Sequence, residues 1–91
     1  MKIRRICTND VDQVINLLVN SFSPRYNKTL FSNNLTDSRC ITIVAELDGL
    51  IVGVASLYVI EKLTRIMGLI EDVAVDSNQR GKGIGKKLIE N

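Results

Sequence analysis

Residues 70–86 read IEDVAVDSNQRGKGIGK, an apolar run followed by a loop that contains three glycines. The apolar run predicts a strand over Leu69–Val75, Asp76–Lys82 predicts a loop, and apolar spacing predicts a helix from about Gly83. Closely spaced glycines let the backbone turn tightly, and a helix start leaves N–H groups unpaired beside partial positive charge. Basic side chains add to this charge: Arg80, Lys82, Lys86 and Lys87. The stretch therefore predicts an anion site for a phosphate or pyrophosphate.

The glycine spacing excludes two common classes of phosphate loop. A Walker A loop requires a second glycine five positions after Gly81, where Lys86 stands instead. The dinucleotide fingerprint GxGxxG also fails, since its last glycine would fall on Lys86 or Leu88. The spacing that is present is Arg80-x-x-Gly83-x-Gly85.

The region before this stretch is typical of antiparallel strands. Ile41–Leu47 is β-branched and aliphatic, and Asp48-Gly49 is a strong signal for a tight two-residue turn. Leu50–Ile60 then predicts the returning strand, with Gly53 at a bulge or a close backbone contact. Glu61–Gly68 predicts a mixed connection to the next strand.

The N-terminal part predicts a short strand and an amphipathic helix. Lys2–Ile6 is a β-type segment, and Thr8-Asn9-Asp10 supplies residues that cap a helix start. Apolar residues at helical spacing predict one core-facing stripe: Val11, Val14, Ile15, Leu18 and Phe22. Ser23-Pro24 ends this helix, and Arg25–Arg39 is consistent with either a short helix or a loop.

Together these elements predict an α+β fold in the order β-α-(α)-β-β-β-loop-α, with a mixed, mostly antiparallel sheet flanked by helices. A length of 91 residues allows one domain, so we expect residues 1–91 to form a single, partial domain. The chain ends at Asn91, about two turns into the last helix, where a further strand would normally follow. We expect a fold truncated before a fifth strand, with an exposed edge on Leu69–Val75 that favours a homo-oligomer.

The composition excludes several kinds of site. The chain has no histidine, so histidine bases and histidine metal ligands are excluded. Cys7 and Cys40 lack metal-ligand spacing, and we expect no metal and two small, buried, reduced thiols. We expect Lys2, Arg4 and Arg5 on the solvated surface.

Charge and apolar runs limit partners and compartment. A net charge of +2 with only two Tyr and two Phe argues against a nucleic-acid partner. The longest apolar stretch is too short to span a bilayer, and no apolar region follows the N-terminal charges. We therefore expect a cytoplasmic protein without a membrane segment.

On these residues the chain resembles the GNAT superfamily of N-acetyltransferases. Arg80-x-x-Gly83-x-Gly85 is similar to the Arg/Gln-x-x-Gly-x-Gly/Ala loop that binds the coenzyme A pyrophosphate in that family. The resemblance covers essentially the whole chain in the family's order, including three further segments: Ile3–Leu18, Ala45–Gly53 and Ile70–Asp76. Ile70-Glu71-Asp72-Val73 is similar to glucosamine-6-phosphate N-acetyltransferases, and other small-amine acetyltransferases look alike there.

The resemblance implies acetyl-CoA as cofactor and a primary amine of a small molecule as acceptor. Glu71 and Asp72 are the candidate catalytic residues, taking the proton of the amine or holding a cationic substrate. Without a bulge, these neighbours would point to opposite faces of a strand, and solvated roles stay open for both. The implied cofactor-binding residues would hold the pantetheine arm or the pyrophosphate: Val73, Ala74, Val75, Arg80, Gly81, Lys82, Gly83, Ile84, Gly85 and Lys86.

Two other functions remain open from the sequence. One is a non-catalytic acyl-CoA-binding or regulatory module, and the other is a phosphate or nucleic-acid binder that uses the basic loop. The tyrosine that often protonates the leaving thiolate in the family lies on a later helix, beyond Asn91. The general acid, the acceptor amine and the oligomeric state therefore stay open.

Overall fold

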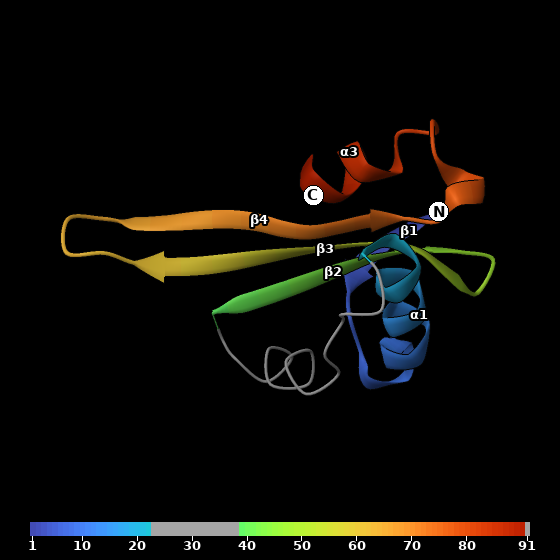
Figure 1. The fold of residues 1–91 in the computed structure, drawn as a ribbon, viewed down its shortest axis with the longest axis horizontal. Coiled ribbons are helices and arrows are strands. Elements are labelled where there is room, and N and C mark those ends of the chain that lie inside the picture. The colour runs from blue at the N-terminus through green and yellow to red at the C-terminus, as the bar shows by residue number, and fades with distance from the viewer. Residues whose placement is uncertain (23–38, 91) are drawn as a thin grey trace.

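A computed structural model describes residues 1–22 and 39–90 of the chain. Its strands form one sheet in the order β1-β2-β3-β4, and every neighbouring pair is antiparallel. Helix α1 lies on one face of this sheet and helix α3 on the other (Figure 1). The bounds are β1 Lys2–Arg5, α1 Val11–Phe22, β2 Cys40–Leu47, β3 Leu50–Glu61, β4 Ile66–Val75 and α3 Ile84–Glu90. The α+β fold and its element order are confirmed, whereas the optional helix expected within Arg25–Arg39 falls almost wholly outside the described residues.

Each face of the sheet has its own apolar cluster. On the α1 face, Val14 and Leu18 are buried as the helical stripe predicts, and Leu17 joins them. On the α3 face, Ile84 and Leu88 pack against the sheet. Burying one such side chain contributes roughly 1.5–3 kcal/mol, so the two clusters hold α1 and α3 in place. The clusters also contain sheet residues: Val44, Ile51, Val54 and Ala74 on the α1 face, and Ala45, Val52 and Ala55 on the α3 face.

The hairpin between β2 and β3 forms as the sequence predicts. Asp48 and Gly49 have φ angles of 52° and 82°, which suit the tight turn that matches the twist of the strands. Gly53 lies beside a register shift and also allows a close approach. A Cβ there would lie 3.0 Å from Cγ2 of Ile84 and 3.1 Å from Cδ1 of Leu88. The expected bulge is confirmed, whereas the close contact is made by side chains of α3 and not by backbone; the missing side chain of Gly53 lets α3 pack directly on β3.

The connection between β3 and β4 is shorter than the expected Glu61–Gly68, since only residues 62–65 lie outside the two strands. Strand β4 already begins at Ile66, which pairs with Glu61, and the Lys62 N–H donates to the Arg65 carbonyl at 2.8 Å. Strand β2 begins only at Cys40, so the ends of β3 and β4 continue beyond it as a two-stranded ribbon (Figure 1). A four-residue turn between β3 and β4 allows the two strands to extend in this way. The mixed apolar and polar sequence of this region does not indicate such a turn.

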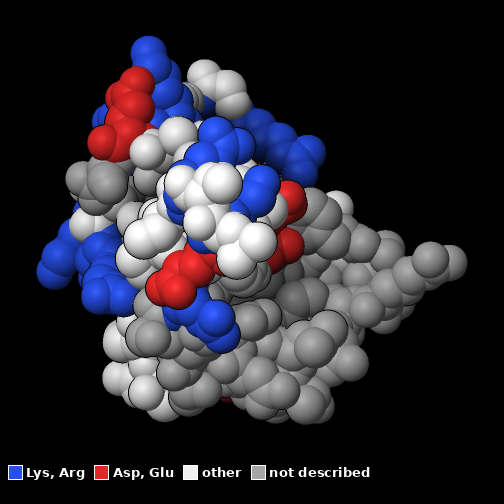
Figure 2. Space-filling model, turned by 90° about the vertical axis from the view of Figure 1, so that its left-hand side faces the viewer, with Lys and Arg blue, Asp and Glu red and all other residues white. Residues whose placement is uncertain are grey.

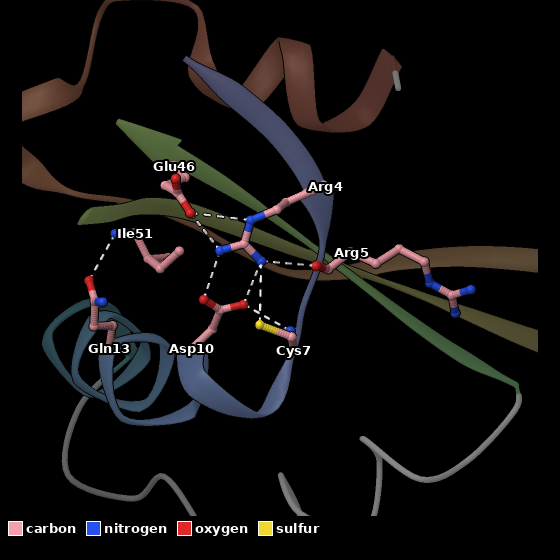
Figure 3. Close-up of polar contacts among 7 residues, drawn as sticks. All are labelled: Arg4, Arg5, Cys7, Asp10, Gln13, Glu46 and Ile51. Carbon is pink, nitrogen blue, oxygen red and sulfur yellow. Dashed lines mark hydrogen bonds and ion pairs between the residues drawn. The ribbon is translucent and has the colours of Figure 1, made fainter. Parts of the chain in front are cut away.

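Arg4 is half-buried, contrary to the expectation of a solvated side chain. Its side chain is only 23% exposed, and it donates to both carboxylate oxygens of Asp10 at 2.7 and 2.8 Å (Figure 3). It also donates to Oε1 of Glu46 at 2.7 Å. The network joins β1, the start of α1 and the end of β2, which only the fold brings together. Lys2 and Arg5 are exposed as expected.

The network fixes the ionisation of its members. The Arg4 guanidinium holds the pKa of Asp10 well below its usual range, and the two carboxylates raise the pKa of Arg4. Asp10 also accepts a hydrogen bond from the Cys7 N–H at 2.8 Å. Cys7 itself is exposed, so the prediction of a buried filler is wrong for it and confirmed for Cys40; both thiols are free.

Candidate active site

The glycine loop lies between the end of β4 and the start of α3. Gly81 and Gly83 have φ angles of 83° and 77°, a conformation that favours glycine. The Lys87 N–H donates to the Gly83 carbonyl at 3.1 Å and begins the hydrogen-bond ladder of the helix. The N–H groups of Ile84, Gly85 and Lys86 therefore precede the ladder and have no acceptor within α3. The loop has the backbone geometry that the sequence predicts for an anion site.

The basic side chains of the loop are exposed and only loosely held. The Arg80 Nε donates to the Val75 carbonyl at 3.3 Å, and the Lys82 Nζ donates to Oε1 of Gln79 at 3.1 Å. The Lys86 Nζ lies 3.8 Å from a carboxylate oxygen of Glu90, one helical turn away. Exposed pairs of this kind contribute little to stability. These cations can therefore turn toward an anion at small cost.

Strand β4 contains a β-bulge beside the loop. Val54 pairs with Ala74 and Ser56 pairs with Glu71, so Ala55 alone faces two residues of β4, Asp72 and Val73. Asp72 has a φ of 55°, which aspartate tolerates better than most residues. A bulge of this kind bends the strand and redirects the side chains beside it.

The bulge changes where the two candidate carboxylates point. Glu71 lies opposite Ser56, and Asp72 accepts a 2.7 Å hydrogen bond from the hydroxyl of Tyr58. Ser56 and Tyr58 are two positions apart on β3, so they share one face of the sheet. Asp72 and Glu71 therefore leave β4 on the same face, which is the α1 face because Val54 and Ala74 pack in the cluster there. The opposite-face arrangement expected for an unbulged strand does not occur.

Tyr58 is the residue of this region that the sequence analysis missed. Its ring is partly buried, and it lies opposite Cys40 in the register of β2 and β3. Burial and the carboxylate of Asp72 raise the pKa of Tyr58 above its ordinary value. Its alternation with Ser56 places it on the α1 face, but only the bulge brings Asp72 within its reach.

The implied cofactor residues lie together at one end of the sheet. Val73 and Val75 pack against the α3-face cluster, and Ala74 is buried on the α1 face. In the described part of the chain β4 pairs with β3 alone, so its outer backbone groups face no other strand. The side chains of Val73–Val75 thus anchor the strand while its outer edge and the adjoining loop stay accessible.

Other classes of site find no support in residues 1–22 and 39–90. Within these ranges, no three His, Cys, Asp or Glu side chains gather as metal ligands, and no helix is long and apolar enough to cross a membrane. Figure 2 views the molecule toward the tip of the β3–β4 ribbon, and basic and acidic side chains are interspersed there. The described residues on this face form no continuous basic surface of the kind that binds nucleic-acid backbones.

Comparisons with known proteins agree with this geometry. The curated glucosamine 6-phosphate N-acetyltransferase of Trypanosoma brucei brucei is 54% identical in an alignment 44 residues long, which covers 45% of this chain and 30% of that protein. The crystal structure of glucosamine-6-phosphate N-acetyltransferase from Arabidopsis thaliana is 30% identical with a TM-score of 0.79, covering 98% of this chain and 69% of that one. An aminoglycoside acetyltransferase from an uncultured soil metagenomic sample is 33% identical with a TM-score of 0.81, covering 98% and 64%.

The chain thus spans about two thirds of the length of these solved structures, and its match to the curated relative covers under a third of that protein. The profile described as "Acetyltransferase (GNAT) family" matches residues 11–91, which is most of the chain. The match includes the β2–β3 hairpin, the bulged strand and the glycine loop. The chain belongs to the acetyltransferase (GNAT) family.

Proposed function

We propose that this chain binds acetyl-CoA and takes part in transferring its acetyl group to a primary amine of a small molecule. The observation that carries the proposal is a bulged strand with two carboxylates that leads, through one short 3-10 turn, into the glycine loop. The loop suits the pyrophosphate of coenzyme A, and Glu71 and Asp72 lie on β4, the strand that precedes it. The C-terminal part of β4 and the loop after it would thus supply both the cofactor-binding groups and the carboxylates that act on the acceptor amine.

In this proposal the cofactor is held mainly by backbone. The N–H groups of Gly81–Lys86 bind the pyrophosphate, and Arg80 and Lys82 add charge. The outer edge of Val73–Val75 pairs with the pantetheine arm as an added strand would. A backbone N–H of this edge polarises the thioester carbonyl, in the manner of an oxyanion site.

The carboxylates act on the acceptor. The amine nitrogen attacks the thioester carbon, the new C–N bond forms, and the C–S bond breaks to release coenzyme A as a thiolate. The proton that the nitrogen loses on becoming an amide passes through water to this thiolate, which leaves as the thiol. An ammonium ion cannot attack, so its proton passes first to Glu71 or Asp72, directly or through a water molecule. The same negative charges attract a cationic amine to the α1 face of β4.

Amino sugars are the acceptors to test first. The curated relative and the Arabidopsis structure are named for glucosamine 6-phosphate, and the metagenomic structure is named for aminoglycosides. Both names describe small, hydroxylated amines. We propose the cytoplasm as the compartment, consistent with two free thiols among the described residues.

Calorimetric titration of acetyl-CoA into the purified chain tests cofactor binding. Gly83→Ala should weaken binding about tenfold, because an alanine at this φ costs about 1–2 kcal/mol. Gly49→Ala is the matched control, since Gly49 has a similar φ of 82°, and a Cβ at either glycine has no neighbour within 4 Å. Equal weakening by both variants, or no binding by a folded chain, would contradict the proposal.

An acetylation assay against a panel of amines separates catalysis from binding alone. The transferase function is supported if the chain acetylates an amino sugar and if Asp72→Ala or Glu71→Ala lowers the rate of this acetylation. Tight binding of acetyl-CoA with no turnover on any amine would favour the non-catalytic acyl-CoA-binding module instead.

A further inference from the structure

A phenol–carboxylate contact links β3 to the bulge of β4. The Tyr58 hydroxyl donates to Oδ2 of Asp72 at 2.7 Å. Tyr58 pairs with Leu69, three positions before Asp72, so the contact runs diagonally between the strands. In a regular strand Asp72 would point to the other face and could not be reached. The bulge and the hydrogen bond are therefore parts of one arrangement.

The two partners differ in how firmly they are held. Tyr58 is partly buried and lies in the interior of β3, between its pairing partners on β2 and β4. Asp72 is exposed and lies where the ladder is interrupted. The tyrosine is thus the fixed partner, and its hydroxyl selects one orientation of a carboxylate that would otherwise rotate.

We propose that Tyr58 is a positioning residue that turns Oδ1 of Asp72 toward the acceptor amine. Oδ2 is occupied by the phenol, and no side chain in residues 1–22 and 39–90 donates to Oδ1. An ionised carboxylate accepts at both oxygens, so Oδ1 can receive the N–H of an amine while Oδ2 stays bound. This inference rests on the proposed function, because that function assigns Asp72 to the binding or deprotonation of the acceptor amine.

The protonation state of Tyr58 suits this task. Its partial burial and the neighbouring Asp72 carboxylate keep the phenol protonated well beyond neutral pH, and the Cys40 thiol acts in the same direction. Tyr58 therefore remains a donor over the whole range in which an amine is acetylated. A short hydrogen bond to an ionised acceptor is among the stronger side-chain contacts.

Steady-state acetylation by the Tyr58→Phe variant tests the proposal. Phenylalanine keeps the ring and its packing but removes the hydroxyl. We expect kcat to fall about tenfold, with the KM for acetyl-CoA changed less than about twofold, because only the acceptor side loses a contact. Within an Asp72→Ala background, Tyr58→Phe should cause no further loss, since its effect passes through Asp72.

A spectroscopic measurement checks the contact without activity. Asp72→Ala should lower the pH at which Tyr58 ionises, as followed by tyrosinate absorbance, and thermal unfolding should show that the variants remain folded. An unchanged Tyr58 titration would overturn the hydrogen bond in solution.

The kinetic outcomes separate this inference from the proposed function. Wild-type kcat in Tyr58→Phe, together with a low kcat in Asp72→Ala, would overturn the positioning role and leave the transferase intact. The positioning role would also be overturned, and the transferase left intact, if Tyr58→Phe lowered kcat by the same factor in the parent chain and in the Asp72→Ala background. A chain that acetylates no amine, or an active Asp72→Ala variant, would overturn the role of Asp72 and this inference with it.

Discussion

Both terminal nitrogens of Arg4 face both carboxylate oxygens of Asp10, at 2.7 and 2.8 Å, in a bidentate pair. This pair joins the first strand to the start of the first helix, and Asp10 is only 4% exposed. A carboxylate at that depth depends on its partners, because burying a charge without them is costly. The pair therefore compensates the burial of Asp10 and ties β1 to the segment that leads into α1.

Asp10→Ala should destabilise the fold by about 2 kcal/mol, since it removes several charge-assisted hydrogen bonds and leaves Arg4 half-buried. Asp12→Ala is the matched control, because Asp12 follows two positions later, in the first turn of α1, but is exposed. Its change should stay within about 0.5 kcal/mol. Urea unfolding measures the unfolding free energy of both variants. Equal losses of stability would show that the contact between Arg4 and Asp10 does not stabilise the fold.

The stability of the fold should decline in acid because of the same pair. Arg4 lowers the pKa of Asp10 in the folded state below its ordinary value of 3.8. The unfolded state then binds the proton more readily, so this stabilisation is complete above the ordinary pKa and is lost as the pH falls below it. Unfolding free energies at about pH 6 and about pH 3 should differ less in Asp10→Asn than in the parent chain. An identical pH dependence would contradict this origin.

The raised pKa of Tyr58 predicts that the stability of the fold also declines in alkali. Its folded pKa is raised above the ordinary 10.0, so its stabilisation is present below that value and is lost as the pH rises through the folded pKa. Tyrosinate absorbance should show one late-ionising tyrosine that disappears in Tyr58→Phe. Ionisation of Tyr58 at its ordinary pH would refute the prediction.

Gly53→Ala should displace α3 from the sheet. A Cβ there would press on Ile84 and Leu88, at a cost of about 1–3 kcal/mol. Gly68→Ala is the control, because its Cβ would meet only the mobile end of Leu57, at 3.0 Å. Thermal unfolding should show the larger loss for Gly53→Ala, and acetyl-CoA binding should weaken with it because α3 supports the loop. Equal behaviour of the two variants would argue against the close packing.

The outer edge of β4 predicts self-association. Leu69 and Ile70 are 40% and 45% exposed beside an edge that no described strand covers. Sedimentation equilibrium should detect a homo-oligomer that Ile70→Lys reduces. Leu63→Lys, at the fully exposed ribbon tip, should leave it unchanged. A strictly monomeric parent chain would exclude this mode of association.

Local signals in the sequence predicted much of the fold and of the cofactor loop. Asp48-Gly49 and Gly83 require backbone conformations that few other residues adopt, so the hairpin and the loop could be located from residue type alone. The long β4 was missed because its first residues are stabilised by pairing across a turn. The Arg4–Glu46 contact was missed because it joins residues 42 positions apart. The bulge at Asp72 leaves almost no local mark, since aspartate is only mildly enriched at positive φ.

The strand order separates early from late folding events. Strands β2, β3 and β4 are joined by tight turns, so their contacts close short loops, whereas β1 pairs with β2 only across the span from Arg5 to Ile43. Closing that longer loop costs more entropy before any contact repays it. We expect the three-stranded meander to gain amide protection first in pulse-labelled hydrogen exchange. The N-terminal strand and helix would then dock onto this meander, and the contacts of Arg4 with Asp10 and Glu46 would form last.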